Sequence, residues 1–269
     1  SSVSIVMGFG DGTFESENRI QAGDGPASIV VGDFTGDGVQ DLAVANVFDG
    51  LSFIAGRGNG LFERSRNQYV GNTPFDVATA DFDADGKQDV AVALTSGTVN
   101  VALGAGDGTF GVQNPVADVP GASSLASGDL NGDGLMDLVA SYINGGIASV
   151  ILETGPGVLG PVTLVPDGQN PASALLVDLN LDGNLDMVLA NRTLPGLVSV
   201  RLGHGDGTFA PGLGFASVTA LPRTLAWADL NGDGRPDLAA GGGAFVGILM
   251  GLGDGSFPPA VLGRAGNNG

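Results

Sequence analysis

Five copies of one acidic loop, Asp-x-(Asp/Asn/Thr)-x-Asp-Gly-x-x-Asp, divide this chain of 269 residues into repeats. The copies occupy residues 33–41, 81–89, 129–137, 178–186 and 229–237. They begin about 50 residues apart, a spacing that indicates one supersecondary unit copied along the chain. Oxygen ligands at alternating positions around a glycine are what a hard divalent cation such as Ca²⁺ requires. The motif therefore predicts both a repeat architecture and a set of metal sites.

The composition favours an all-β fold. Hydrophobic residues make up 43% of the chain, which is enough for a core, while 48 Gly and 14 Pro interrupt it at short intervals. Such punctuation predicts many short strands joined by tight turns. The glycines follow no three-residue period, which excludes a collagen-like fold.

The charge of the chain restricts its partners. Its net charge is −19, and more than half of its 29 acidic residues lie in the five loops, so the acidity is mostly ligand chemistry. No basic stripe is available to neutralise phosphates, so we expect no nucleic-acid partner. The absence of cysteine excludes disulfides, thiol catalysis and Cys-based zinc sites. The uncharged run Leu238–Gly253 is too short and too rich in glycine to span a bilayer, so we expect no membrane insertion.

The first full repeat reads as four strands. Ala27–Gly32 leads into the acidic loop, Leu42–Ala45 leaves it, Leu51–Ala55 follows, and Glu63–Val70 is mostly polar. Hydrophobicity falls from the first stretch to the fourth, so we expect the first strands to be covered on both faces and the fourth to form an edge. Four strands per repeat at this period are typical of a β-propeller blade.

A glycine-rich segment follows the third strand of most repeats. It recurs at Gly8–Phe14, Gly104–Phe110, Gly203–Phe209 and Gly251–Phe257, whereas Glu153–Gly160 lacks the Asp-Gly. Asp-Gly at the apex predicts a two-residue hairpin, and the terminal Phe is expected to plug the space between blades. A phosphate-binding loop would need a following helix and a Gly-Lys-Ser/Thr ending, and the segments have neither.

Together, the glycine-rich hairpins and the acidic loops, in fixed phase over essentially the whole chain, resemble the FG-GAP or VCBS repeats of integrin-α-type β-propellers. The resemblance implies an all-β propeller of four-stranded antiparallel blades, with calcium in the loop between the first and second strands. We expect a single domain, 1–269, with five full repeats near 27–72, 75–119, 122–170, 172–220 and 223–264, and an N-terminal half blade at 1–24. With five loops but six hairpin positions, the number of blades stays open at this point.

In such loops the side chains at positions one, three, five and nine and the carbonyl at position seven converge on one ion. The predicted ligands of about five Ca²⁺ ions are Asp33, Thr35, Asp37, Val39 and Asp41; Asp81, Asp83, Asp85, Lys87 and Asp89; Asp129, Asn131, Asp133, Leu135 and Asp137; Asp178, Asn180, Asp182, Asn184 and Asp186; and Asp229, Asn231, Asp233, Arg235 and Asp237. An EF-hand would need a Glu at position twelve and two helices, and RTX nonapeptides would recur every nine residues. Acidic turns without metal are the remaining alternative.

We expect no catalysis, and no catalytic residue is predicted. His204, the single histidine, lies between two glycines of a hairpin and is expected to be a turn residue. No motif places a Ser nucleophile beside it. Carboxylate pairs for glycoside hydrolysis stay an alternative, but most carboxylates belong to loops and turns, and filled cages leave little room to activate water.

The leading hypothesis for function is an extracellular, calcium-stabilised adhesion module with a protein or glycan ligand at the cell surface, since calcium is abundant there. A carbohydrate-binding lectin, or the propeller of a polysaccharide-active enzyme, is the alternative. Lectin pockets often use aromatic rings, but Trp227 lies two residues before a loop and is expected to pack in the core. Candidate surface positions for a partner are Arg57, Arg64, Arg66, Phe48 and Tyr142.

Overall fold

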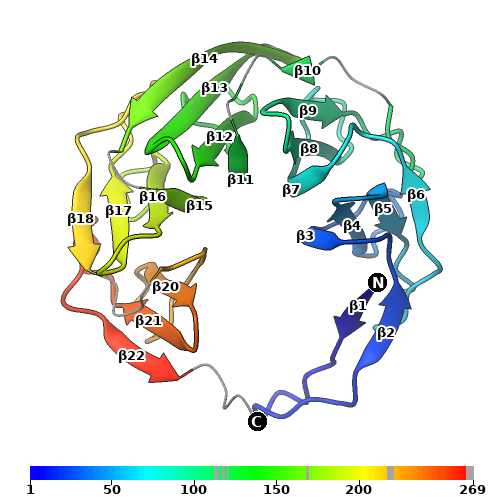
Figure 1. The fold of residues 1–269 in the computed structure, drawn as a ribbon, viewed down its shortest axis with the longest axis horizontal. Coiled ribbons are helices and arrows are strands. Elements are labelled where there is room, and N and C mark those ends of the chain that lie inside the picture. The colour runs from blue at the N-terminus through cyan, green and yellow to red at the C-terminus, as the bar shows by residue number, and fades with distance from the viewer. Residues whose placement is uncertain (112–114, 117–118, 120, 168–169, 217–220, 265–269) are drawn as a thin grey trace. The chain divides into compact units, whose positions relative to one another are not determined.

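The computed structural model describes residues 1–111, 115–116, 119, 121–167, 170–216 and 221–264. These residues form strands and turns, without a helix, and thus without a helix that could cross a membrane. Contacts divide the chain into two compact units, Ser1–Pro120 and Gly121–Gly269. The all-β prediction is confirmed, and Figure 1 shows the strands in chain order.

The first unit holds a two-stranded sheet and two four-stranded blades. The two-stranded sheet pairs β1 (Ser2–Ile5) with β2 (Asn18–Gln21). The first blade contains β3 (Pro26–Gly32), β4 (Asp41–Asn46), β5 (Gly50–Ile54) and β6 (Arg66–Gln68). The second blade contains β7 (Pro74–Ala80), β8 (Asp89–Leu94), β9 (Val99–Ala102) and β10 (Pro115–Val116).

The second unit holds three four-stranded blades. The third blade contains β11 (Ala122–Gly128), β12 (Asp137–Tyr142), β13 (Ile147–Gly155) and β14 (Val158–Pro166). The fourth contains β15 (Pro171–Val177), β16 (Asp186–Asn191), β17 (Leu197–Arg201) and β18 (Leu213–Ala216). The fifth contains β19 (Thr224–Ala228), β20 (Asp237–Gly242), β21 (Phe245–Leu249) and β22 (Val261–Arg264).

Every blade has the same antiparallel order, in which each strand pairs with the next along the chain. The register places the ninth loop residue opposite the last residue of the first strand, as in the pair Gly32 and Asp41 and the pair Ala80 and Asp89. Each acidic loop therefore closes the hairpin between the first and second strands, as predicted. The fold is that of β-propeller blades, five complete ones plus the N-terminal pair of strands.

Burial is greatest in the second strand of a blade, not in the first as hydrophobicity alone had predicted. All six residues of β4, β8 and β16 are buried, whereas Ile29 and Val31 of β3 are 44% and 54% exposed. The first strand is an edge with one hydrogen-bonded neighbour, while the second has a strand on each side. The expectation was therefore wrong for β3, whereas the first strands β7 and β15 are mostly buried or half-buried.

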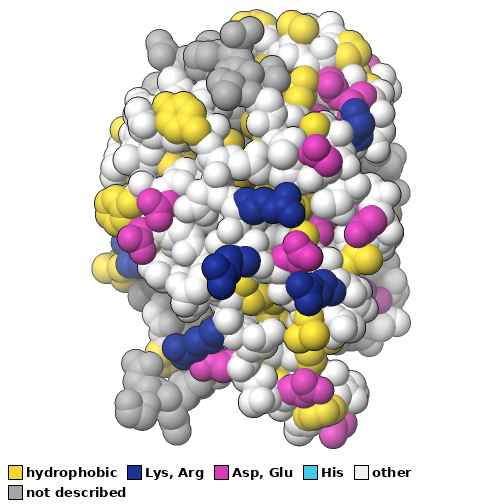
Figure 2. Space-filling view, turned by 90° about the vertical axis from the view of Figure 1, so that its right-hand side faces the viewer, with side chains coloured by type: hydrophobic (Ala, Val, Ile, Leu, Met, Phe, Trp, Pro, Cys, Tyr) yellow, Lys and Arg dark blue, Asp and Glu magenta, His cyan; other side chains and the backbone are white. Residues whose placement is uncertain are grey.

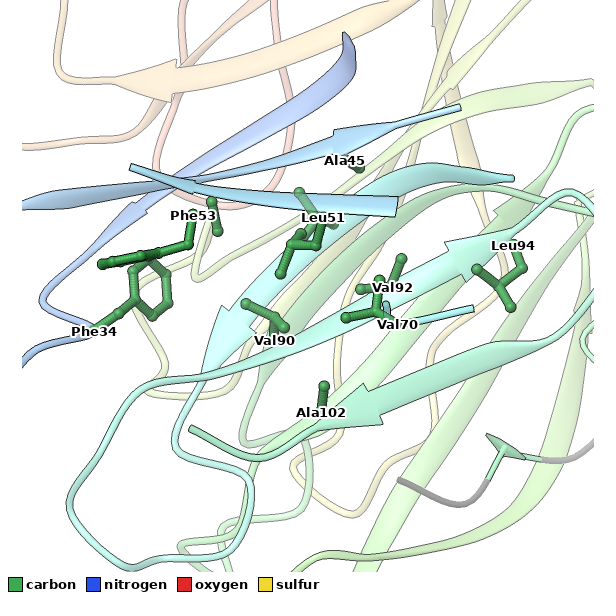
Figure 3. Packing of buried hydrophobic residues seen from close by; sticks show 11 residues of the cluster. Phe34, Ala45, Leu51, Phe53, Val70, Val90, Val92, Leu94 and Ala102 are labelled. Carbon is green, nitrogen blue, oxygen red and sulfur yellow. The ribbon is translucent and has the colours of Figure 1, made fainter. Parts of the chain in front are cut away.

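The phenylalanines that end the glycine-rich hairpins pack against the preceding sheet. Phe110 lies edge-on to Phe34 and Phe53 of the first blade, at ring-centroid distances of 5.4 and 6.5 Å. Figure 3 shows the core around Phe34 and Phe53, to which β4, β5, β7, β8 and β9 contribute buried residues. Phe62, Phe209 and Phe257 pack into the corresponding cores. The expected plugging role is confirmed for these four, but Phe14 is 63% exposed.

The hairpins themselves differ from the two-residue turn that was expected. The N–H of Ala105 donates to the carbonyl of Thr109, so the turn spans the three residues Gly-Asp-Gly. Both glycines have positive φ, and a Cβ on Gly108 would lie 2.2 Å from the ring of Phe53. The extra glycine therefore lets the turn lie directly on the neighbouring blade. In the divergent third blade, the hairpin is formed instead by β13 and β14, which are each nine residues long.

These equivalent positions give a matched pair of variants. Phe110→Ala is expected to lower the free energy of unfolding by about 2 to 3 kcal/mol, somewhat less than the 3 to 5 kcal/mol typical of a fully buried Phe. Phe14→Ala removes the same ring from an exposed site and is expected to cost below about 0.5 kcal/mol. Urea denaturation of both variants checks this, and equal losses would contradict the packing described here.

The N-terminal strands complete the core of the first blade. Val3, Ile5 and Ile20 pack with residues of β4 and β5 and with Phe62. The bridge from Gly8 to Phe14 matches the bridges of the full hairpins at Gly56–Phe62 and Gly104–Phe110. The strands β1 and β2 thus have the hairpin of a third and fourth strand, which agrees with the predicted half blade.

Candidate metal centres

Each acidic loop bends around its first aspartate. In the first loop, Oδ1 of Asp33 accepts the N–H groups of Gly36 and Asp37 at 2.7 and 3.2 Å, and Oδ2 accepts that of Gly38 at 2.8 Å. Backbone donors, that of Gly38 foremost, hold the pKa of Asp33 below its usual range. The same pattern recurs at Asp129 and Asp229.

Two tight bends give the loop its shape. Glycine at position six has positive φ in every copy, with values from 81° at Gly234 to 91° at Gly183. Position four also has positive φ, and there Ala84 and Leu181 replace the glycine of the other three loops. A side chain in this region is strained. The sequence motif marked the bend at position six but not the bend at position four.

The aspartate at position five of the motif orders the second half of the loop. In the third loop, Oδ1 of Asp133 accepts the N–H of Leu135 at 2.8 Å, and Oδ2 accepts the side-chain amide of Asn131 at 3.0 Å. Asn180 and Asp182, and Asn231 and Asp233, repeat this pairing. The asparagines that replace Asp at position three therefore keep an oxygen in the loop and also bind the neighbouring carboxylate.

The aspartate at position nine of the motif holds the blade together. The sequence analysis predicted it only as a metal ligand and missed this role. Asp89 is fully buried, and its two oxygens accept the N–H groups of Phe82 and Gly104 at 2.7 and 2.6 Å. Residues Asp41, Asp137, Asp186 and Asp237 are equally buried and make the same two bonds. Each thus ties the loop to the end of the third strand.

Burying these carboxylates has an electrostatic cost. Desolvation raises the pKa of Asp89 to about 6, against the two backbone hydrogen bonds that lower it, and the charges of Asp83 and Asp81 raise it further. Burial likewise raises the pKa of Asp137 and Asp186. A cation beside these groups would offset the repulsion between carboxylates, which is about 4 kcal/mol at 4 Å and an effective dielectric near 20.

The second loop brings three carboxylates together. Oxygens of Asp81, Asp83 and Asp89 lie within 4.8 Å of one another. This all-oxygen donor set fits a hard divalent cation such as Ca²⁺. Asp85 is held differently, since the ammonium of Lys87 lies 2.6 Å from its Oδ2. Sequence reasoning assigned the carbonyl of Lys87 as a ligand and missed this ion pair.

The remaining predicted ligands lie in the loops where the sequence placed them. Thr35 donates its hydroxyl to Asp41 at 3.2 Å. The N–H groups of the position-seven residues Val39, Asn184 and Arg235 bind the aspartate two residues earlier. The structure thus supplies the loop geometry, while ion binding stays a prediction.

The ligand sets predict an order of affinity. The second loop, with four carboxylates, is expected to bind Ca²⁺ most tightly, and the first, with a neutral Thr35, least tightly. Calorimetric titration of Asp85→Ala should lack the tightest binding step, and that of Asp37→Ala the weakest. Lys87→Gln should tighten the second site, because it removes a competing cation. The reverse order would contradict the assignment.

Two aromatic residues, Trp227 and Tyr142, lie elsewhere than expected. Trp227 is 51% exposed, so its predicted core position is wrong. It lines a pocket of about 450 Å³ with the leucines 176, 181 and 185 and the first aspartates of two loops. The sequence around it gave no signal, since four of the five residues of the edge strand β19 are exposed although most of them are apolar. Tyr142, by contrast, is half-buried, and its ring lies over Gly121 and Gly145.

The arginines are exposed, but two of the three are paired. Arg57 and Arg66 contact Glu63 at 3.6 and 3.8 Å. Figure 2 shows basic side chains on one face with acidic ones among them. His204 lies exposed in its hairpin turn, with its N–H bound to the carbonyl of Thr208, as a turn residue would.

These blades and loops define a class, that of β-propeller repeat proteins with an acidic loop in each repeat. An FG-GAP-like repeat model matches residues 33–92, 81–140 and 178–240, and an FG-GAP repeat model matches residues 121–162. The chain belongs to the FG-GAP repeat family. No sequence among the curated proteins compared matches it.

Solved structures share the fold at low identity. A lectin of Agrocybe aegerita that recognises non-reducing terminal N-acetylglucosamine is 21% identical, with a TM-score of 0.68, over 96% of this chain and 73% of that one. BBS1N, solved in complex with ARL6DN, is 16% identical, with a TM-score of 0.59 over 90% and 69%. Sqt1 of Saccharomyces cerevisiae is 13% identical, with a TM-score of 0.59 over 90% and 63%. These likenesses show the fold alone.

Proposed function

We propose that this chain is a calcium-stabilised, non-catalytic module that binds a ligand at the cell surface. The observation that carries the proposal is the recurrence of one acidic loop geometry in five blades, with three carboxylates within 4.8 Å in the second loop. Loops of this kind place their acidic groups at the cost of repulsion and desolvation, which a bound dication offsets. An extracellular location follows, because calcium is abundant there.

The chemistry of the described residues favours binding over catalysis. The aspartates at positions one, five and nine of the loops are committed to backbone hydrogen bonds, and the hairpin aspartates Asp11, Asp107, Asp206 and Asp254 each bind the residue two positions on. A general acid or base needs a positioned group free to exchange a proton with a substrate. Blades of this type present their loops as a rigid surface, which suits adhesion.

A carbohydrate ligand is the second candidate. The fold likeness to the Agrocybe aegerita lectin supports it, as does the exposure of Phe48, Tyr69 and Trp227, since exposed rings can stack on sugars. Under this interpretation the same calcium-stabilised blades carry a glycan site instead of a protein site.

Glycan and cell-surface protein arrays, probed with the labelled chain in 2 mM calcium and in EDTA, test the proposal. We expect binding to at least one class in calcium and its loss in EDTA. Binding that EDTA leaves unchanged, or turnover of the bound ligand, would contradict a calcium-stabilised, non-catalytic module.

A further inference from the structure

The first unit carries a small pocket at the ends of the blades opposite the acidic loops. It has a volume of about 280 Å³ and lies between the turn from β4 to β5 and the segment from β6 into β7. Its lining includes Phe48 and Tyr69, which are 77% and 64% exposed. These are the two most exposed aromatic side chains among the described residues. Two exposed rings in one small pocket indicate a ligand with an apolar face.

The pocket also offers oriented polar groups. The hydroxyl of buried Ser52 donates to Oδ1 of Asn67 at 2.7 Å and accepts from the side-chain amide of buried Asn46 at 2.9 Å. This relay fixes the amide of Asn67 so that its NH₂ group can donate to a ligand. Asp49 accepts the N–H of Asp24 through Oδ2 at 2.6 Å, which leaves Oδ1 as an acceptor.

The backbone around the pocket is held in shape. Thr73 adopts a φ of 53°, unusual for a non-glycine residue. A Cβ on Gly50 would lie 2.7 Å from the carbonyl oxygen of Gln68, and a Cβ on Gly25 would lie 2.9 Å from the ring of Phe48. The ring of Phe48 thus packs directly against the backbone of Gly25. Strained and closely packed backbone of this kind is common at binding sites.

We propose that this pocket binds a single neutral sugar ring, an assignment that rests on the proposed ligand-binding function and specifies its ligand. An aromatic ring stacks on the C–H face of a pyranose, while the amide of Asn67 and the carboxylate of Asp49 pair with its hydroxyls in opposite senses. The volume of about 280 Å³ lies just below the usual range of small-molecule sites, which suits one ring. Asp49 and the net charge of −19 disfavour acidic or sulfated sugars.

The pocket does not have the groups of a hydrolase. Asp49 is the single carboxylate among the residues that line it, whereas glycoside hydrolysis uses a pair. The site therefore holds the sugar without cleaving it. None of its lining residues is a predicted metal ligand, so variants here leave the acidic loops intact.

Saturation-transfer NMR and calorimetry with the methyl β-glycosides of glucose, galactose, mannose and N-acetylglucosamine, in 2 mM calcium, test the assignment. We expect at least one glycoside to bind. Tyr69→Ala should weaken it at least tenfold through lost stacking, and Tyr69→Phe about threefold or less. Asn67→Asp keeps the acceptor for Ser52 but loses the donor, and should also weaken binding at least tenfold.

Phe14→Ala is the matched control, since it removes an equally exposed ring outside the pocket, and it should bind within twofold of the wild type. Because the altered side chains are exposed, unchanged melting temperatures establish that the variants fold. If no glycoside binds, if Tyr69→Ala and Asn67→Asp bind as the wild type does, or if the pocket takes a neutral peptide instead, the assignment is overturned. A calcium-dependent melting temperature would then still support the proposed module, so the two failures are distinguishable.

Discussion

Removing calcium with EDTA is expected to lower the melting temperature of this protein by roughly 6 °C or more. At about 2 mM calcium and dissociation constants of roughly 0.1 to 1 mM, each occupied loop adds about 0.6 to 1.8 kcal/mol to the free energy of unfolding. Five loops together add about 3 to 9 kcal/mol, and each kcal/mol shifts the melting temperature of a chain this size by about 2 to 4 °C. Differential scanning calorimetry in calcium and in EDTA measures the shift.

Ion identity supplies the control for this experiment. Magnesium at the same concentration should restore little of the lost stability, because it demands a compact octahedral shell and gives up water reluctantly. Sodium chloride of equal ionic strength should restore less, because screening weakens repulsion without filling the loops. A melting temperature that is the same in calcium and EDTA would show that the acidic turns need no metal.

Asp89→Ala is expected to destabilise the protein even when no calcium is present. The substitution leaves the buried N–H groups of Phe82 and Gly104 without their acceptor. Each orphaned donor costs about 1 to 3 kcal/mol, and relief of the desolvated charge offsets part of this, so we expect a net loss of about 2 to 4 kcal/mol. Urea denaturation in EDTA measures the loss.

Asp85→Ala is the matched variant in the same loop. Asp85 is exposed, and its hydrogen-bond partners are the N–H and ammonium of Lys87. In EDTA it should stay within about 1 kcal/mol of the wild type, since surface substitutions have small effects. Both variants should bind one calcium ion fewer. Equal stability of the two variants in EDTA would show that Asp89 serves only as a ligand.

The sequence predicted the strand layout well because its signals are local. The acidic loops marked the turn between the first and second strands, and the glycine-rich hairpins marked the turn between the third and fourth. The alternation of these two motifs was therefore enough to assign four strands to each blade. Composition could not predict burial, since Ile29 and Val31 are apolar yet exposed on an edge strand. For the same reason Trp227 was misplaced.

The sequence likewise predicted some features of the candidate sites and missed others. Loop positions followed from the motif, but the backbone hydrogen bonds of Asp89 depend on Gly104, which is 15 residues away and across the blade. The Lys87 ion pair needed side-chain geometry. The pocket at Phe48 and Tyr69 joins residues with no shared motif. Sequence periodicity finds what each repeat has in common, whereas this pocket depends on what one repeat has alone.

Counting bound ions tests the central claim most directly. Native mass spectrometry of the protein, first stripped with EDTA and then returned to 2 mM calcium, should show a mass increase of five calcium ions per chain, reduced to four in Asp85→Ala. A spectrum without bound calcium, or a stoichiometry that Asp85→Ala leaves unchanged, would contradict the assignment of the acidic loops as metal sites.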